Sequence, residues 1–264
     1  MKKIKNIKQL LLQILLVICI LAVVIFAGMI VRELLIDKQS QTFYENILAG
    51  IETNPREQSS PTGQDNRPGS NPDDISDEPF VPYVDFDKLN ERFPGIVGWI
   101  KLYDSPIDYP VMQHTNNDYF LSRLPDGTSH RSGSIFLDYR NSSDFSDRSI
   151  LIYGHESHER EMFGILKNYR NQSFFDENPV MYLYTPERDY EIRIFAVHLA
   201  HSQRDHPPLS FRDEEEFMQY IRQIQSISLI TSGIEISAGD RIVSLCTCAY
   251  DFDEARLVIV GVLI

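Results

Sequence analysis

Three residues in the second half of the chain have side chains suited to acyl transfer: Cys248, His155 and Arg256. A thiolate attacks a carbonyl carbon, an imidazole passes protons between thiol and amine, and a guanidinium stabilises the oxyanion of a tetrahedral intermediate. Cys248 ends the apolar run 241–248, and His155 enters a loop directly after the apolar run 149–153. These residue types predict a cysteine enzyme that acts on carbonyl groups, while spacing alone leaves their assembly open.

A second thiol, Cys246, lies two residues before Cys248, and the third, Cys19, lies in an apolar N-terminal segment. Alternate residues of a strand share a face, so Cys246 and Cys248 are expected to be neighbours. Their Cα atoms would be about 7 Å apart, which is unfavourable for a disulfide. Either thiol is therefore a reactive group or a buried structural one.

Arg256 follows an acidic turn, residues 251–254, that separates two apolar runs. If these runs form an antiparallel pair, Cys248 and Arg256 come close across the hairpin. The alternative for Arg256 is an ion pair at the rim with Asp253 or Glu254. The alternative for His155 is an ordinary surface loop residue. Five other histidines are interpreted as structural or surface residues: His114, His130, His198, His201 and His206.

Short β-like runs with turn residues between them dominate the chain after residue 80. We expect strands at 96–103, 107–113, 132–139, 149–153, 179–184, 190–200, 241–249 and 255–263. Short helices are expected at 85–92, 116–122 and 160–169, and an amphipathic helix at 212–227. About eight strands with a few peripheral helices favour a closed or nearly closed β-barrel, because closure removes exposed strand edges.

The N-terminus carries a candidate membrane anchor. Residues 10–31 are almost entirely apolar and follow four lysines, as expected for a single transmembrane helix with a cytoplasmic N-terminus at 1–9. A cleaved signal peptide is the alternative. In both cases the rest of the chain is expected outside the cytoplasm.

A linker is expected to separate this anchor from the folded domain. Residues 38–52 are interpreted as a short amphipathic helix, and 54–79 contain almost no large apolar side chains, which predicts a disordered tether. The domain boundaries are therefore 32–79 for the linker and 80–264 for the catalytic domain. Residues 37–264 carry a net charge of −17, and this acidic balance argues against nucleic-acid binding.

The segment around Cys248 resembles the signature of the sortases, membrane-anchored cysteine transpeptidases of Gram-positive bacteria. The family pattern is Thr-Leu-x-Thr-Cys with an Arg in the next strand; here it is Ser244-Leu245-Cys246-Thr247-Cys248, then Arg256. Ser at the first position and Cys at the variable position are departures. The alignment assigns Cys248 as the nucleophile.

Other segments of residues 84–264 are similar to class B of that family. They are Ile107-Asp108-Tyr109-Pro110-Val111, Asn117-Asp118-Tyr119, the run from Gly133 to Asn141, and Leu151-Ile152-Tyr153-Gly154-His155 with Met162-Phe163 after it. The resemblance implies an eight-stranded sortase β-barrel and catalytic roles for His155, Cys248 and Arg256. Thr247 is a candidate substrate contact.

The resemblance also implies a reaction in two halves and no cofactor. The thiolate would cleave a C-terminal sorting signal of a secreted protein after a Thr, and an amine of peptidoglycan or of a pilin would resolve the thioester. The partners would be surface proteins that bear such signals, the cell-wall precursor or pilin amine, and the membrane. The enzyme would act at the outer face of the cell membrane.

Three alternatives stay open. His155, His158, Cys246 and Cys248 have the ligand types of a structural zinc site, although the Cys-x-Cys spacing is tighter than usual. A second alternative is a catalytically silent extracytoplasmic binding module on the same scaffold. The third is a thiol hydrolase that does not transfer its acyl group.

Overall fold

The computed structural model describes residues 2–50, 84–156 and 161–264 of the chain. It contains two compact units, Met1–Leu48 and Ala49–Ile264, which we treat separately. The predicted tether at 54–79 and the predicted domain start at residue 80 lie outside the described residues. The first fully described element of the second unit is helix α2 (Phe86–Arg92), whose N-cap Asp85 accepts a hydrogen bond from Lys88 N.

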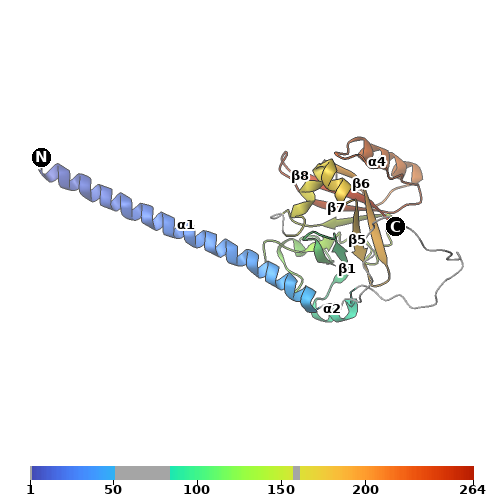
Figure 1. Ribbon diagram of the computed structural model, residues 1–264, viewed down its shortest axis with the longest axis horizontal. Helices are drawn as coiled ribbons and strands as arrows, with labels where there is room; N and C mark the ends of the chain where they lie inside the picture. Colours follow the sequence, from blue (N-terminus) through green and yellow to red (C-terminus); the bar gives the residue numbers. More distant parts are fainter. Residues whose placement is uncertain (1, 51–83, 157–160) are drawn as a thin grey trace. The chain divides into compact units, whose positions relative to one another are not determined.

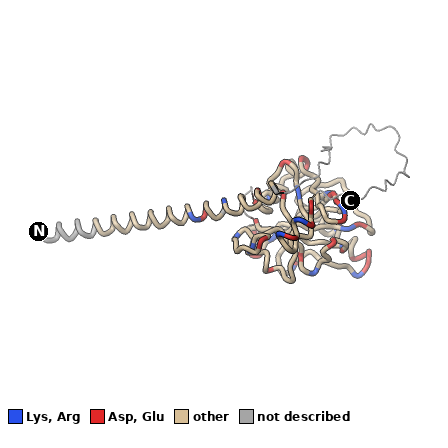
Figure 2. The backbone as a smooth tube through the Cα atoms, turned by 90° about the horizontal axis from the view of Figure 1, so that it is seen from below, with Lys and Arg blue, Asp and Glu red and all other residues tan. Residues whose placement is uncertain are grey.

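The first unit is built on one helix, α1 (Lys2–Gly50) (Figure 1). Its segment Gln13–Ala49 is long and apolar enough to cross a membrane, a test that an N-terminal signal sequence also satisfies. Figure 2 shows few charged residues along this helix. The helix expected at 38–52 is found over its described residues as the end of α1, which continues without a break to Gly50; neither Pro nor Gly interrupts the chain between Gly28 and that residue.

The second unit is a closed β-barrel, as the sequence predicts (Figure 1). Around the barrel the strands follow the order β1-β2-β3-β4-β7-β8-β6-β5. The pairs β2–β3 and β4–β7 are parallel, and the other neighbours are antiparallel. The bounds are β1 (Ile96–Lys101), β2 (Asp108–Met112), β3 (Ile135–Leu137), β4 (Ser149–Tyr153), β5 (Val180–Tyr184), β6 (Asp189–His201), β7 (Ile242–Cys248) and β8 (Ala255–Leu263).

The strands that matter most for the site are buried on both faces. Nearly every residue of β7 and β8 is buried, which explains their continuous apolar runs. Helix α4 (Glu214–Ser226) covers part of this sheet (Figure 1): Phe217, Ile221 and Ile224 belong to the same buried cluster as residues of β6, β7 and β8. Asp213 caps α4 by accepting a hydrogen bond from Glu216 N at 2.8 Å.

Two of the expected short helices are smaller than predicted. The expected helix at 116–122 is only the 3₁₀ turn η1 (Phe120–Ser122), because Asn116 Oδ1 accepts hydrogen bonds from Asp118 N and Tyr119 N in a turn. The expected helix at 160–169 is the 3₁₀ helix η2 (Gly164–Arg170). A further short helix, α3 (Gln172–Glu177), was not expected from the sequence.

Candidate active site

Three adjacent strands bring the predicted catalytic residues to one end of the barrel. In the parallel pair β4–β7, Tyr153 is the register partner of Cys246, and Gly154 N donates to Cys246 O at 3.1 Å. In the antiparallel pair β7–β8, Cys248 is the register partner of Arg256. His155 follows β4, Cys248 ends β7 and Arg256 lies at the start of β8, so all three belong to the same end of neighbouring strands.

The turn that carries His155 is sterically defined. A Cβ on Gly154 would lie 2.6 Å from the Phe163 ring and 2.5 Å from the end of Ile135, so only glycine fits there. Phe163 N donates to His155 O at 3.1 Å and closes the turn. The imidazole Nε2 lies 2.6 Å from Leu121 O. A carbonyl oxygen only accepts, so Nε2 carries the hydrogen and Nδ1 is the nitrogen left for proton exchange.

Arg256 is held near the strand end by local contacts. Its Nη1 donates to Ala255 O at 2.9 Å, and its Nη2 lies 3.8 Å from the Glu254 carboxylate. The side chain is 31% exposed. The sequence alternative of a rim ion pair is therefore present with Glu254, but at a distance too long for a hydrogen bond, which leaves most of the guanidinium donors available.

The two neighbouring thiols differ strongly in burial. Cys246 is 4% exposed, and burial raises the pKa of its thiol to about 12, although Arg256 acts to lower it. Cys248, at the strand end, is partly exposed. At neutral pH Cys246 is thus a protonated thiol packed under α4, and Cys248 is the thiol with access to a substrate.

Beside these residues lies a cavity of about 150 Å³. Arg256 and Cys246 contribute to its wall, while Cys248 and His155 are not among the lining residues. The remaining wall comes from β4, β6, β8 and the β6–α4 connection (residues 202–213): Tyr153, Ala200, His201, Ser202, His206, Pro207 and Val258. The cavity is therefore adjacent to the strand ends that carry the thiol and the imidazole.

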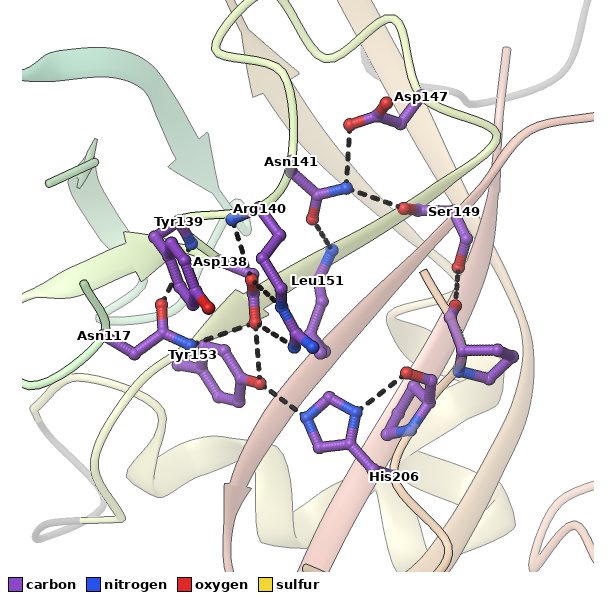
Figure 3. A network of polar contacts seen from close by, with 12 residues as sticks. Asn117, Asp138, Tyr139, Arg140, Asn141, Asp147, Ser149, Leu151, Tyr153 and His206 are labelled. Carbon is purple, nitrogen blue, oxygen red and sulfur yellow. Dashed lines mark hydrogen bonds and ion pairs between the residues drawn. The ribbon is translucent and has the colours of Figure 1, made fainter. Parts of the chain in front are cut away.

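A buried polar network supports one side of this cavity (Figure 3). Asp138 is fully buried and accepts hydrogen bonds from Arg140 Nε and Nη2 at 2.8 Å, from Asn117 Nδ2 at 3.0 Å and from Tyr153 Oη at 3.1 Å. Burial alone would raise the pKa of this carboxyl, but the hydrogen bonds from Arg140 and Asn117 outweigh it and lower the pKa to about 2. Asp138 is thus ionised, and Tyr153 donates to it.

The network continues to the β6–α4 connection. Tyr153 Oη lies 2.7 Å from His206 Nε2, and Ser149 Oγ donates to Pro208 O at 2.6 Å. His206 thereby links the wall of the cavity to the barrel, a placement that the sequence did not predict. No local sequence signal pairs it with Tyr153, because the two residues come from segments far apart in the chain.

Thr247, the candidate substrate contact, is 2% exposed, and its Oγ1 has no hydrogen-bond partner in the described part of the chain. Strand alternation places it on the face opposite Cys248. Of the four predicted site residues it has the least access to a ligand. His158, one of the four candidate zinc ligands, lies outside the described residues. Over residues 2–50, 84–156 and 161–264, no group of three or more metal-binding side chains is found.

Comparison with known proteins places the chain among named relatives, although no family model matches it. Sortase B of Listeria monocytogenes is 35% identical over 182 residues, which are 68% of this chain and 73% of that protein. The Staphylococcus aureus sortase B–substrate complex superposes with a TM-score of 0.64 at 28% identity and covers 68% of this chain and 84% of that chain. A structure of sortase B complexed with triglycine gives a TM-score of 0.64 at 29% identity and covers 68% of this chain and 85% of that chain.

Proposed function

The chain belongs to the sortase B family of cysteine transpeptidases, and from this premise we propose that Cys248, His155 and Arg256 carry its catalytic steps. The observation that supports this assignment is the register of three neighbouring strands: Tyr153 opposite Cys246, and Cys248 opposite Arg256. The cavity beside them supplies room for part of a peptide.

Cys248 is the proposed nucleophile. Its sulfur attacks the carbonyl carbon of the scissile peptide bond, and the C–N bond of the tetrahedral intermediate then breaks to leave a thioester. The burial and raised pKa of Cys246 support the choice between the two thiols, because a thiol with a pKa of about 12 is almost wholly protonated at neutral pH.

His155 is the proposed acid and base. The imidazolium gives the Nδ1 proton to the departing amine, and the neutral ring later takes a proton from the incoming amine at the same nitrogen. The Leu121 carbonyl, 2.6 Å from Nε2, supports this role because it fixes the ring orientation and leaves Nδ1 for proton exchange.

Arg256 is the proposed oxyanion stabiliser. Its guanidinium has donors that the contacts to Ala255 O and Glu254 do not occupy. A permanent cation beside the thiol stabilises the negative oxygen of both tetrahedral intermediates. Thr247 remains proposed only as a neighbour of the substrate, and its burial gives this role the weakest support.

The proposed substrates are secreted proteins with a C-terminal sorting signal, and the proposed acceptor is an amine of peptidoglycan or of a pilin. The relatives solved with a substrate and with triglycine support a peptide donor and an amine acceptor. The apolar segment within α1 supports attachment to the membrane, and the lysines that precede it support a cytoplasmic N-terminus with the barrel outside.

The function is tested with the full chain in detergent micelles and peptides of the Leu-Pro-x-Thr, Asn-Pro-x-Thr and Ser-Pro-x-Thr types. Mass spectrometry should detect an acyl-enzyme on Cys248, and adding triglycine should give an amide product. Formation of acid alone, at every triglycine concentration, would identify a thiol hydrolase. An acyl group on Cys246, or one zinc ion per chain by metal analysis, would overturn the assignment.

A further inference from the structure

An ion pair outside the proposed catalytic residues joins two segments that adjoin them. Arg170, the last residue of η2, donates from Nη1 and Nη2 to the two carboxylate oxygens of Asp251, at 2.8 and 2.7 Å. Such a bidentate pair is stronger and more directional than a single contact. Each side chain is 32% exposed, so solvent screens this pair less than a fully exposed one.

Asp251 belongs to the β7–β8 loop, residues 249–254, which begins directly after Cys248. Ala249 N donates to Ala255 O at 3.0 Å and closes the base of this loop. At the far end Ser202 holds Glu254, through N to the Glu254 carbonyl at 3.0 Å and through Oγ to its carboxylate at 2.6 Å. The Arg170 pair fixes the middle of the loop at Asp251, next to Phe252, whose ring stacks on His201 with the centroids 6.3 Å apart.

The same guanidinium also lies near the segment that carries the imidazole. Glu156 follows His155 directly, and burial raises the pKa of its carboxyl, whereas Lys167 and Arg170 act to lower it and Asp251 to raise it. Its Oε2 and the Nε of Arg170 are buried atoms without a hydrogen-bond partner among the described residues. Arg170 therefore pairs directly with a carboxylate of the loop after Cys248 and also acts electrostatically on the carboxylate next to His155.

Helix η2, which carries Arg170, is held in place by buried side chains. Leu166 and Tyr169 are fully buried, and Tyr169 Oη donates to Asn178 O at 2.8 Å. Arg170 thus extends from a fixed element toward the β7–β8 loop.

We propose that Arg170 is a positioning residue: through Asp251 it fixes the loop after Cys248 relative to η2, the helix that follows the His155 segment, and so keeps the thiol placed against the imidazole for catalysis. This role rests on the proposed function of Cys248 and His155. Arg170 acts through Asp251 on the loop after Cys248, so the expected effect is on the geometry of the reacting groups. Misplacement of reacting groups by about 1 Å costs on the order of 100-fold in rate.

The test compares Arg170→Met with Arg193→Met in the full chain. Arg193 forms a comparable pair with Glu191 on β6, at 2.9 Å, with both side chains about half exposed. Arg170→Met is expected to lower kcat by about 10–100-fold with KM nearly unchanged, and Arg193→Met to leave both constants unchanged. Asp251→Asn should lower kcat similarly, and the double variant should be no worse than the worse single one.

Exchanging the two charged residues tests whether the ion pair itself, and not either side chain alone, supports kcat. Arg170→Asp combined with Asp251→Arg should recover part of the kcat that either single change removes. Three results would overturn the proposal. They are a normal kcat in folded Arg170→Met, losses of kcat that multiply in the double variant Arg170→Met/Asp251→Asn, and an equal loss of kcat in Arg193→Met. Peptide cleavage by Cys248→Ala would instead refute the proposed function. The effect of Arg170→Met on kcat is a separate measurement and would not be decided by that result.

Discussion

At the scale of single residues, burial separates two thiols that the sequence cannot separate. Cys246 and Cys248 share a face of β7, but one lies under α4 and the other at the open end of the strand. The same distinction applies to a hydroxyl nearby: Thr247 is next to the proposed nucleophile in sequence yet buried on the opposite face. Exposure, and not proximity in the chain, therefore decides which of these side chains reaches a substrate.

Cys248→Ala is expected to abolish peptide cleavage and acyl-enzyme formation, because it removes the attacking sulfur. Cys246→Ala is expected to keep much of the activity, with a small loss of stability from the cavity it leaves. Peptide cleavage followed by mass spectrometry measures both effects. Equal loss in two folded variants would contradict the choice of nucleophile.

His155→Ala and Arg256→Ala are each expected to lower kcat/KM by about 100-fold or more, the usual scale for a lost acid–base group or oxyanion donor. Arg256→Lys should recover little, because a lysine does not reproduce the fixed fork of donors. Steady-state kinetics with the cleaved peptide measures these losses. A near-normal rate in either alanine variant would remove that residue from the mechanism.

At the scale of elements, the β6–α4 connection is joined to the barrel by polar contacts rather than by strand pairing. Tyr153 of β4 contacts both Asp138 and His206, and Ser149 of β4 donates to Pro208 O. Asp138 itself is held by Arg140 and Asn117 (Figure 3). One buried carboxylate thus joins the loops of Asn117 and Arg140 to β4 and, through Tyr153, to the β6–α4 connection.

Tyr153→Phe is expected to loosen the β6–α4 connection, because it removes the hydroxyl that joins Asp138 and His206. Amide hydrogen exchange at residues 202–207 should become faster, and KM for the peptide should rise several-fold while kcat changes less. Tyr139→Phe is the matched control, since Tyr139 is half exposed on the segment next to Asp138. Unchanged exchange at 202–207 would show that the connection is held by other contacts.

Asp138→Asn is expected to reduce stability in a pH-dependent way. The folded-state pKa of about 2 lies below the ordinary value of 3.8, so ionised Asp138 stabilises the folded state above pH 4 and this contribution disappears as the pH falls toward 2. The shift corresponds to about 2 kcal/mol. Trp99, the single tryptophan and a buried residue of β1, reports barrel unfolding by fluorescence. If the loss of folding stability caused by Asp138→Asn stays constant from pH 6 to pH 3, this account is contradicted.

Sequence patterns predicted the strands that carry the site but not the contacts that support it. The apolar runs of β4, β7 and β8 and the amphipathic α4 were found because burial imposes periodicity. The short helix α3 and the turn at Asn116 were missed or misjudged, because a few residues carry no period. The Asp138–Tyr153–His206 network and the Arg170–Asp251 pair depend on tertiary placement, for which a single sequence holds no signal.

At the scale of the whole molecule, two units of opposite character are joined in one chain. α1 is apolar over the candidate span, while charged residues of both signs occur throughout the barrel unit (Figure 2). The proposed chemistry needs only the second unit, because every residue assigned to it lies between His155 and Arg256. The first unit is expected to set where the enzyme works and not how it works.

Removal of residues 1–79 is therefore expected to leave cleavage of a soluble peptide within about two-fold of the full chain, because the barrel keeps its own core. The full chain should float with liposomes in a density gradient, and the truncated chain should not. Kinetics on the soluble peptide and flotation measure the two properties independently. A folded but inactive truncated chain would show that the removed segment takes part in the site.

The position of β8 in the barrel also bears on when the proposed nucleophile can first react. β8 is the last strand in chain order, yet it lies between β7 and β6, where it completes the sheet and delivers Arg256 opposite Cys248. Until β8 inserts, the growing polypeptide has Cys248 but lacks both its proposed oxyanion partner and the closed barrel. With the proposed roles of Cys248 and Arg256, a chain whose synthesis has not yet reached β8 is therefore expected to be inert toward peptides, and activity is expected to begin only when folding is complete.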